Sequence, residues 1–257
     1  MRALPVEEAA REIASALRRS KFAVAFTGAG ISTESGIPDF RSPGTGLWHK
    51  YDPEIFTLRY FLEHPEEFYE VALERFLPIL DAEPNPSHRL LAELERRGMI
   101  KAVITQNIDG LHQKAGSENV VELHGHLRSA SCVTCGARVP MPELLRRVEA
   151  GSMPPRCHEC GGLLKPDVVL FGERLPMEAL QKAQALAVEC DLMLVVGSSL
   201  VVYPAAEIPR IAHAHGAKVA IVNRDPTDLD HMADILCHCE LRDFTSALAR
   251  ELGIEVS

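Results

Sequence analysis

The sequence lacks any apolar run long enough to cross a membrane. Its longest apolar runs, at 22–26 and 192–196, have the length of a strand, far short of the roughly 20 residues that a transmembrane helix needs. The N-terminal stretch also lacks the basic and apolar pattern of a secretory signal, since Glu7 and Glu8 stand there instead. We therefore expect a cytoplasmic protein with no membrane partner.

An excess of basic charge is absent as well. The chain has 27 Lys and Arg against 36 Asp and Glu, a formal net charge of −9, and such a field repels nucleic-acid phosphates. No internal repeat, low-complexity segment or linker divides the 257 residues, and 46% of them are hydrophobic, enough for a substantial core. We expect no nucleic-acid partner, a single domain over 1–257 and a monomer.

Short apolar runs alternate with helical patterns along the chain. The apolar runs lie at 22–26, 102–105, 168–171, 192–196 and 217–222, and the helical patterns at 10–17, 87–98, 177–188 and 244–252. In the second helix Ser87 is the expected N-cap and Gly98 the expected end. This alternation predicts an α/β fold with a doubly wound, Rossmann-like parallel sheet, whose ligands bind at the carboxyl ends of the strands.

Two stretches interrupt this alternation. Residues 37–86 contain helical pieces and a cluster of aromatic residues, whereas 125–166 contain four cysteines and few apolar residues. We expect these inserts to form a smaller lobe, a helical insert together with a zinc ribbon. The Rossmann-like lobe would then comprise about 1–36, 87–124 and 167–257.

A glycine-containing turn, Thr27-Gly28-Ala29-Gly30, directly follows the first apolar run. A dinucleotide-binding fold places such a turn there, so that backbone N–H groups can approach a pyrophosphate. The motif is incomplete, because Thr33 stands where a third glycine would fall and no acidic residue closes a second strand. Taken alone, the glycines also fit a purely structural strand-to-helix turn.

Four of the seven cysteines form two C-x-x-C pairs, Cys132 with Cys135 and Cys157 with Cys160. Two such pairs can surround one tetrahedral ion, and four thiolates leave no position open for water, so we predict one structural Zn²⁺ per chain. A redox dithiol is the alternative. The other three cysteines are interpreted as ordinary buried thiols: Cys190, Cys237 and Cys239.

Polar residues follow several of the expected strands. Gln106, Asn107 and Asp109 follow the run at 102–105, His124 follows 120–123, and further polar residues follow the later runs, namely Ser198, Ser199 and Asn223. A histidine at a strand end is a candidate general base, because its ordinary pKa of about 6.5 allows proton exchange at neutral pH. Each of these residues taken singly also fits a turn or a cap.

Taken in order, the motifs closely resemble those of the sirtuins, NAD-dependent protein-lysine deacylases. The resemblance rests on both cysteine pairs and on the motifs at 28–32, 36–41, 105–109, 124–125, 171–173, 197–199 and 222–223. It implies that His124 is the general base and that Asn107 and Asp109 position the nicotinamide ribose and carboxamide. It also explains the incomplete glycine motif, because sirtuins bind NAD in an inverted orientation.

The resemblance implies further contacts. The remainder of the nicotinamide end would be lined by Ala29, Gly30, Thr33, Asp39, Phe40, Arg41, Gln106 and Ile108. The adenosine half would be held by Gly197, Ser198, Ser199 and Asn223, with Glu240 at the adenine end. The acyl-lysine peptide would add as a strand beside Val169, Phe171, Gly172 and Glu173.

The resemblance further implies that NAD is a consumed co-substrate. The acyl oxygen would attack C1′ of the ribose and expel nicotinamide, and His124 would then deprotonate the ribose hydroxyls, giving free lysine and O-acetyl-ADP-ribose. Mono-ADP-ribosyl transfer and NAD hydrolysis in the same pocket are the alternatives. A non-enzymatic zinc-ribbon module is a third, although residues 138–156 offer only scattered basic side chains.

One departure from a pattern found in some sirtuins indicates which acyl group this protein removes. Sirtuins that prefer succinyl or malonyl lysine carry a Tyr-x-x-Arg pair, whose arginine binds the acyl carboxylate. Here Tyr69 is present but Ala72 replaces the arginine. We therefore expect a deacetylase, acting on acetyl or another neutral acyl group of a protein or peptide.

Overall fold

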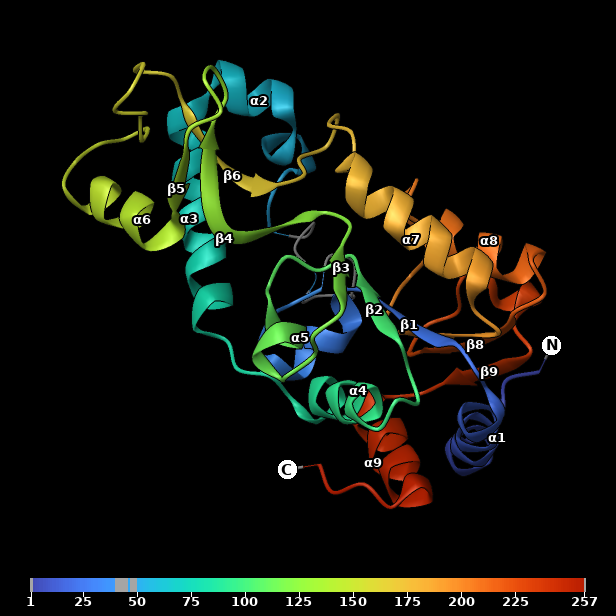
Figure 1. Ribbon diagram of the computed structural model, residues 1–257. Coiled ribbons are helices and arrows are strands. Elements are labelled where there is room, and N and C mark those ends of the chain that lie inside the picture. The colour runs from blue at the N-terminus through green and yellow to red at the C-terminus, as the bar shows by residue number, and fades with distance from the viewer. Residues whose placement is uncertain (1, 40–45, 47–49, 257) are drawn as a thin grey trace.

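A central sheet of six parallel strands organises the chain in the computed structural model, which describes residues 2–39, 46 and 50–256 (Figure 1). The strand order is β3-β2-β1-β7-β8-β9. Their bounds are β1 Ala23–Thr27, β2 Ala102–Thr105, β3 Val120–Glu122, β7 Leu192–Val196, β8 Lys218–Asn223 and β9 Ile235–His238.

Helices cover both faces of this sheet. On one face lie α1 (Val6–Arg19), α4 (Pro86–Arg96) and α9 (Leu241–Leu252), and on the other lie α7 (Met177–Glu189) and α8 (Glu207–Ala214). Successive side chains of a strand point to opposite faces, so Ala23 and Ala25 of β1 join the first core while Val24 and Phe26 join the second. The predicted doubly wound α/β fold is confirmed.

A second, three-stranded antiparallel sheet lies beside the first and has the order β5-β4-β6 (Figure 1). Its strands are β4 Gly125–Cys132, β5 Arg138–Pro140 and β6 Leu164–Val168, and the helices around it are α2 Leu58–Glu63, α3 Pro65–Asp81 and α6 Met141–Glu149. Phe61, Phe68 and Tyr69 stack edge to face in its core. The two inserts thus share a hydrophobic core of their own.

Short helical segments complete the described chain. They are η1 Ala29–Ser35, η3 Pro53–Phe56, α5 Leu111–Lys114 and η4 Asp230–Met232. Among the described residues, no helix combines the length and apolar character that a membrane crossing requires.

Two expectations about these elements are wrong. The run at 168–171 is not a strand of the parallel sheet: β6 ends at Val168 and pairs antiparallel with β4. A short apolar run does not reveal which sheet it joins, because apolarity reports burial and not partners. Helix α4 begins earlier than expected, since the side chain of Asn85 accepts from the backbone N–H of Ser87 at 2.9 Å and is the N-cap. Strand β9 was not anticipated.

The topology fixes where a ligand can bind. The chain crosses from β1 to β2 on one side, and β7 lies on the other side of β1. A doubly wound sheet leaves a crevice at such a switch point, outside the carboxyl ends of the strands. The motifs at 28–32, 105–109, 124–125, 197–199 and 222–223 lie at these strand ends, and 171–173 lies between β6 and α7.

Gly125→Ala is expected to destabilise the fold. Gly125 has φ of +74°, and a Cβ there would lie 2.1 Å from the carbonyl oxygen of Asp167 on β6. The backbone strain and the clash together should lower the free energy of unfolding by about 3 kcal/mol or more.

Gly253→Ala is the matched control, because Gly253 has φ of +61° but open space around its Cβ position. It should cost only about 1 kcal/mol. Urea unfolding of both variants measures the difference, and equal costs would contradict the close approach of β4 and β6 at Gly125.

Candidate active site

A cavity of about 500 Å³ opens at the carboxyl ends of the strands, between the two sheets. Most of the predicted NAD-binding and peptide-binding residues line it together with the predicted base. These residues are Ala29, Gly30, Asp39, Gln106, Asn107, Ile108, Asp109, His124, Val169, Phe171, Gly172, Glu173, Gly197, Ser198, Ser199 and Asn223. The tertiary structure therefore brings residues from the insert at 37–86, from both halves of the sheet and from the segment 168–173 to one site.

Two predicted residues are not in contact with this cavity, and two cannot be placed. The hydroxyl of Thr33 donates to the carbonyl oxygen of Gly30 at 3.0 Å and serves the turn of η1. Glu240 is the N-cap residue of α9 and lies outside the cavity lining. Phe40 and Arg41 lie outside the described residues.

The turn after β1 approaches the end of β7 very closely. The N–H of Gly30 donates to the carbonyl oxygen of Gly197 at 2.9 Å, and a Cβ on Gly30 would lie 2.8 Å from that oxygen. Packing alone therefore requires glycine here, as the structural interpretation of the motif supposed. Gly28, Gly30 and Gly197 also line the cavity. Because they have no side chains, a ligand can approach the backbone closely on this side.

A hydrogen-bonded cluster forms the inner end of the cavity. The side-chain amide of Asn107 donates to the carbonyl oxygen of Gly28 and to the hydroxyl of Ser32, both at 3.1 Å. Ser32 in turn donates to Asp109 at 2.7 Å. Burial raises the pKa of Asp109 above that of an ordinary aspartate. Sequence reasoning missed Ser32, although the residue lies within the Gly28–Ser32 motif.

Two buried histidines stand behind this cluster. The rings of His88 and His112 pack edge to face with centroids 5.0 Å apart, and Nε2 of His88 lies 3.3 Å from the hydroxyl of Ser32. Nε2 of His112 lies 2.9 Å from the hydroxyl of Thr27. Burial lowers the pKa of His88 to about 4, so both rings are neutral at pH 7 and act as hydrogen-bonding supports.

His124 is poised as a base. Its Nδ1 lies 2.8 Å from the carbonyl oxygen of Gln106, and since a carbonyl can only accept, Nδ1 carries the proton and Nε2 keeps a free lone pair. Burial lowers the pKa of His124 below its ordinary value. The imidazole is therefore neutral near pH 7 and can accept a proton at Nε2.

The segment 169–173, which the family resemblance assigns to the peptide, forms one edge of the cavity. Phe171 is 45% exposed at this edge, while its backbone is bonded to Phe56 and Leu58 of the helical insert. The carboxylate of Glu173 accepts from the N–H of Leu170 at 2.7 Å and lies 3.1 Å from Nζ of Lys165. The side chain of Glu173 thus holds the turn that borders the cavity.

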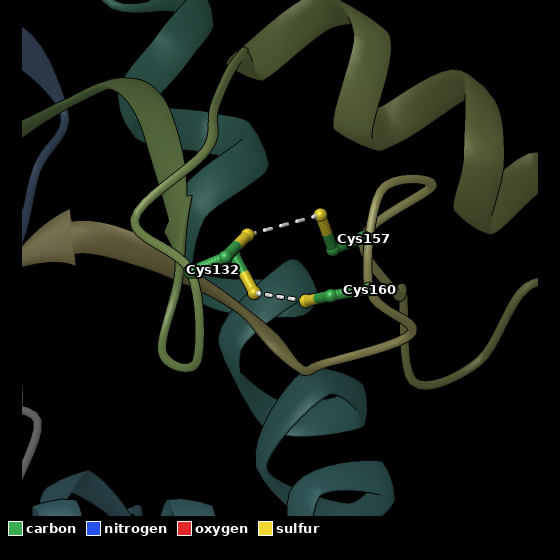
Figure 2. Close-up of side chains that lie close together, drawn as sticks. Cys132, Cys157 and Cys160 are labelled. Atoms are coloured by element: carbon green, nitrogen blue, oxygen red, sulfur yellow. Dashed lines mark hydrogen bonds between the residues drawn. The ribbon is translucent and has the colours of Figure 1, made fainter.

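The four paired cysteines converge on one point in the smaller lobe, where Figure 2 shows the sulfurs of Cys132, Cys157 and Cys160 directed toward one another. The Sγ atoms of Cys132 and Cys160 are 3.5 Å apart, and those of Cys135 and Cys157 are 3.7 Å apart. Ligands of a tetrahedral zinc with Zn–S bonds near 2.3 Å lie about 3.8 Å apart. The quartet fits a closed, structural zinc site and lies away from the cavity.

Comparison with known proteins agrees with this geometry. The family model described as "Sir2 family" matches residues 28–204. The chain belongs to the Sir2 family. It is 49% identical over 245 residues to the NAD-dependent protein deacetylase of Caldivirga maquilingensis, covering 95% of this chain and 94% of that protein. It is 46% identical to the protein of the same name from Thermotoga maritima, covering 95% and 98%.

Solved structures of Sir2 proteins share the whole architecture. A complex described as "Sir2-p53 peptide-NAD+" superposes with a TM-score of 0.90 at 45% identity, covering 95% of this chain and 98% of that chain. A second, "Sir2 bound to acetylated peptide", gives a TM-score of 0.89 at 44% identity, covering 95% and 99%.

This Sir2 protein also has cavity residues that sequence reasoning missed on α3. Arg75, Phe76 and Ile79 line the cavity at helical spacing, a pattern that the sequence displays but that fits a core-facing helix equally well. The guanidinium of Arg75 donates to the carbonyl oxygen of Pro38 at 3.3 Å. Burial lowers the pKa of Arg75.

Cys157→Ser is expected to weaken zinc binding and to unfold the smaller lobe, because the lobe's small core depends on the closed metal site. The loss should be about 3 kcal/mol or more, which lowers Tm by roughly 10 °C. Metal analysis and thermal circular dichroism measure both effects. Cys190→Ser, which alters a buried thiol outside the quartet, should retain full zinc content, and retention of zinc by Cys157→Ser would contradict the assignment.

Proposed function

We propose that this Sir2 protein removes acetyl groups from lysine side chains of proteins and consumes NAD in doing so. The observation that carries the proposal is a single cavity in which the turn 28–30, the neutral His124 and the exposed edge 169–173 all meet. A peptide laid along that edge would place its acyl-lysine side chain beside the base. The names of the similar proteins support the same activity.

The residues present suit NAD. The glycine turn at 28–30 lets a pyrophosphate approach the backbone closely, Asn107 and Asp109 offer polar groups at the inner end, and Ser198 and Asn223 offer them at the other end. When bound, NAD supplies a ribose that can part from nicotinamide and accept the acyl group. The buried inner cluster would orient that ribose and exclude water, so that the acyl oxygen is the nearest nucleophile.

His124 would take a proton from a ribose hydroxyl at Nε2. The Gln106 carbonyl holds the opposite ring nitrogen, and the resulting imidazolium would be stabilised by that same hydrogen bond. Zn²⁺ on the cysteine quartet would take no part in this step, because four thiolates fill its coordination sphere.

We further propose that the chain is divided into a Rossmann-like lobe (about 1–36, 87–124 and 167–257) and a smaller lobe (37–86 and 125–166). We also propose a cytoplasmic location, where such thiolates stay reduced.

His124→Tyr is expected to abolish turnover while the fold is retained. Loss of a general base should lower kcat at least about 100-fold. Mass spectrometry of an acetyl-lysine peptide, with and without NAD, should show deacetylation and equal amounts of nicotinamide and O-acetyl-ADP-ribose in the wild type alone. His126→Tyr, which alters a neighbouring histidine outside the cavity lining, should remain active. NAD consumption without deacetylation would instead indicate ADP-ribosyl transfer or NAD hydrolysis.

Deacetylation should slow at acidic pH because His124 becomes protonated. Its pKa lies below the ordinary histidine value of about 6.5, so the neutral, active form predominates at pH 7 and is lost only as pH drops below that ordinary value. A profile of kcat/KM against pH measures this loss of activity. A midpoint above pH 7 would contradict the assignment of His124 as the base.

Acetyl-lysine is expected to be removed at least about ten times faster than succinyl-lysine on the same peptide. The hydroxyl of Tyr69 donates to the carbonyl oxygen of Leu164 at 2.6 Å, and the side chain is 1% exposed. Neither Tyr69 nor Ala72 lines the cavity, so these two positions offer a succinyl carboxylate no partner. Faster desuccinylation would contradict this prediction and would make Arg75 the residue to replace next.

A further inference from the structure

Two cysteines that the proposed reaction does not use lie in contact at the edge of the parallel sheet. The Sγ atoms of Cys237 and Cys239 are 3.3 Å apart. Cys237 belongs to β9 and is fully buried in the core under α1 and α9, whereas Cys239 lies at a bend just after the strand and is partly exposed. The bend is what brings the two sulfurs together, because successive same-side residues of a straight strand lie farther apart.

The backbone connects this pair to the cavity. Strand β9 pairs with β8 so that Asn223 lies opposite His238, and the N–H of Cys239 donates to the carbonyl oxygen of Asn223 at 3.3 Å. Asn223 lines the cavity at its proposed adenosine end. Glu240, the residue after Cys239, is the N-cap of α9. A shift of Cys239 therefore displaces the segment that positions Asn223.

We propose that Cys237 and Cys239 are a modification site that closes reversibly into a disulfide and thereby weakens NAD binding. The part that concerns NAD rests on the proposed function. The oxidant is a small disulfide such as oxidised glutathione. The thiolate of Cys239, which solvent reaches, attacks one of its sulfurs and releases one thiolate, and Cys237 then loses its proton, attacks the Cys239 sulfur and releases the second. The oxidant is reduced to two thiols, which take up the two protons that the cysteines lose.

Formation of the disulfide would move Cys239 relative to Asn223. A disulfide has an S–S bond near 2.05 Å, so the sulfurs must approach by about 1.2 Å. Cys237 is held in a packed core, so Cys239 makes most of this movement and strains its hydrogen bond to Asn223. The base His124 follows β3, at the opposite edge of the sheet from β9, and is not displaced. The KM for NAD should therefore rise roughly 3- to 10-fold with kcat unchanged.

The modification is tested first by peptide mapping of the zinc-loaded protein after treatment with oxidised glutathione. Trypsin releases residues 225–242 as one peptide that holds Cys237 and Cys239, while the zinc ligands fall in 129–138 and 157–174. The expected result is a peptide lighter by two hydrogens, with the zinc content unchanged. Recovery of both cysteines as free thiols would overturn the proposal.

The functional link is tested by NAD titrations of the reduced and oxidised protein, both as KM in the deacetylation assay and as Kd by calorimetry. Oxidation should raise both values in the wild type and neither in Cys239→Ser, which lacks the attacking thiolate, with Cys190→Ser responding like the wild type. A disulfide that leaves both values unchanged would overturn the proposal. Should the protein fail to deacetylate, the proposed function fails, whereas the peptide map and the calorimetric Kd still decide this inference.

Discussion

The site depends on the close contact between the turn after β1 and the end of β7. Two neighbouring parallel strands end there, and the chain departs from them in opposite directions, which opens a crevice. The hydrogen bond from Gly30 to Gly197 is possible only because neither residue carries a side chain. The backbone of this turn thereby borders the cavity on one side, and the ends of β2 and β8 complete its wall.

The buried histidines in and behind the cavity carry no charge near pH 7. His88, His112 and His124 are all neutral at pH 7 because burial lowers their pKa values, and burial raises the pKa of Asp109. Neutral side chains that are hydrogen-bonded to one another hold a fixed geometry without the cost of burying an unpaired charge. Such an environment suits a reaction in which a base must stay unprotonated and water must be kept away.

The smaller lobe and the edge of the sheet use cysteine in two different ways. Four sulfurs at distances near those of a tetrahedral metal site hold together a lobe whose own core is small. At β9, two sulfurs in contact have no third or fourth ligand around them among the described residues, so their chemistry is that of a dithiol. The number of sulfurs that meet, four in the smaller lobe and two at β9, distinguishes the two clusters.

The sequence by itself determined the fold class, the order of the motifs, the cysteine quartet and the family, because apolar periodicity, strand-end polarity and C-x-x-C spacing are local properties of a chain. It placed His124 and Asp109 at strand ends but gave no reason to include Ser32, Arg75 or the α3 residues, and it assigned the run at 168–171 to the wrong sheet. It interpreted Cys237 and Cys239 as ordinary thiols. Those features were decided by tertiary structure, since which strands pair, which helix face borders a cavity and which sulfurs meet depend on residues distant along the chain.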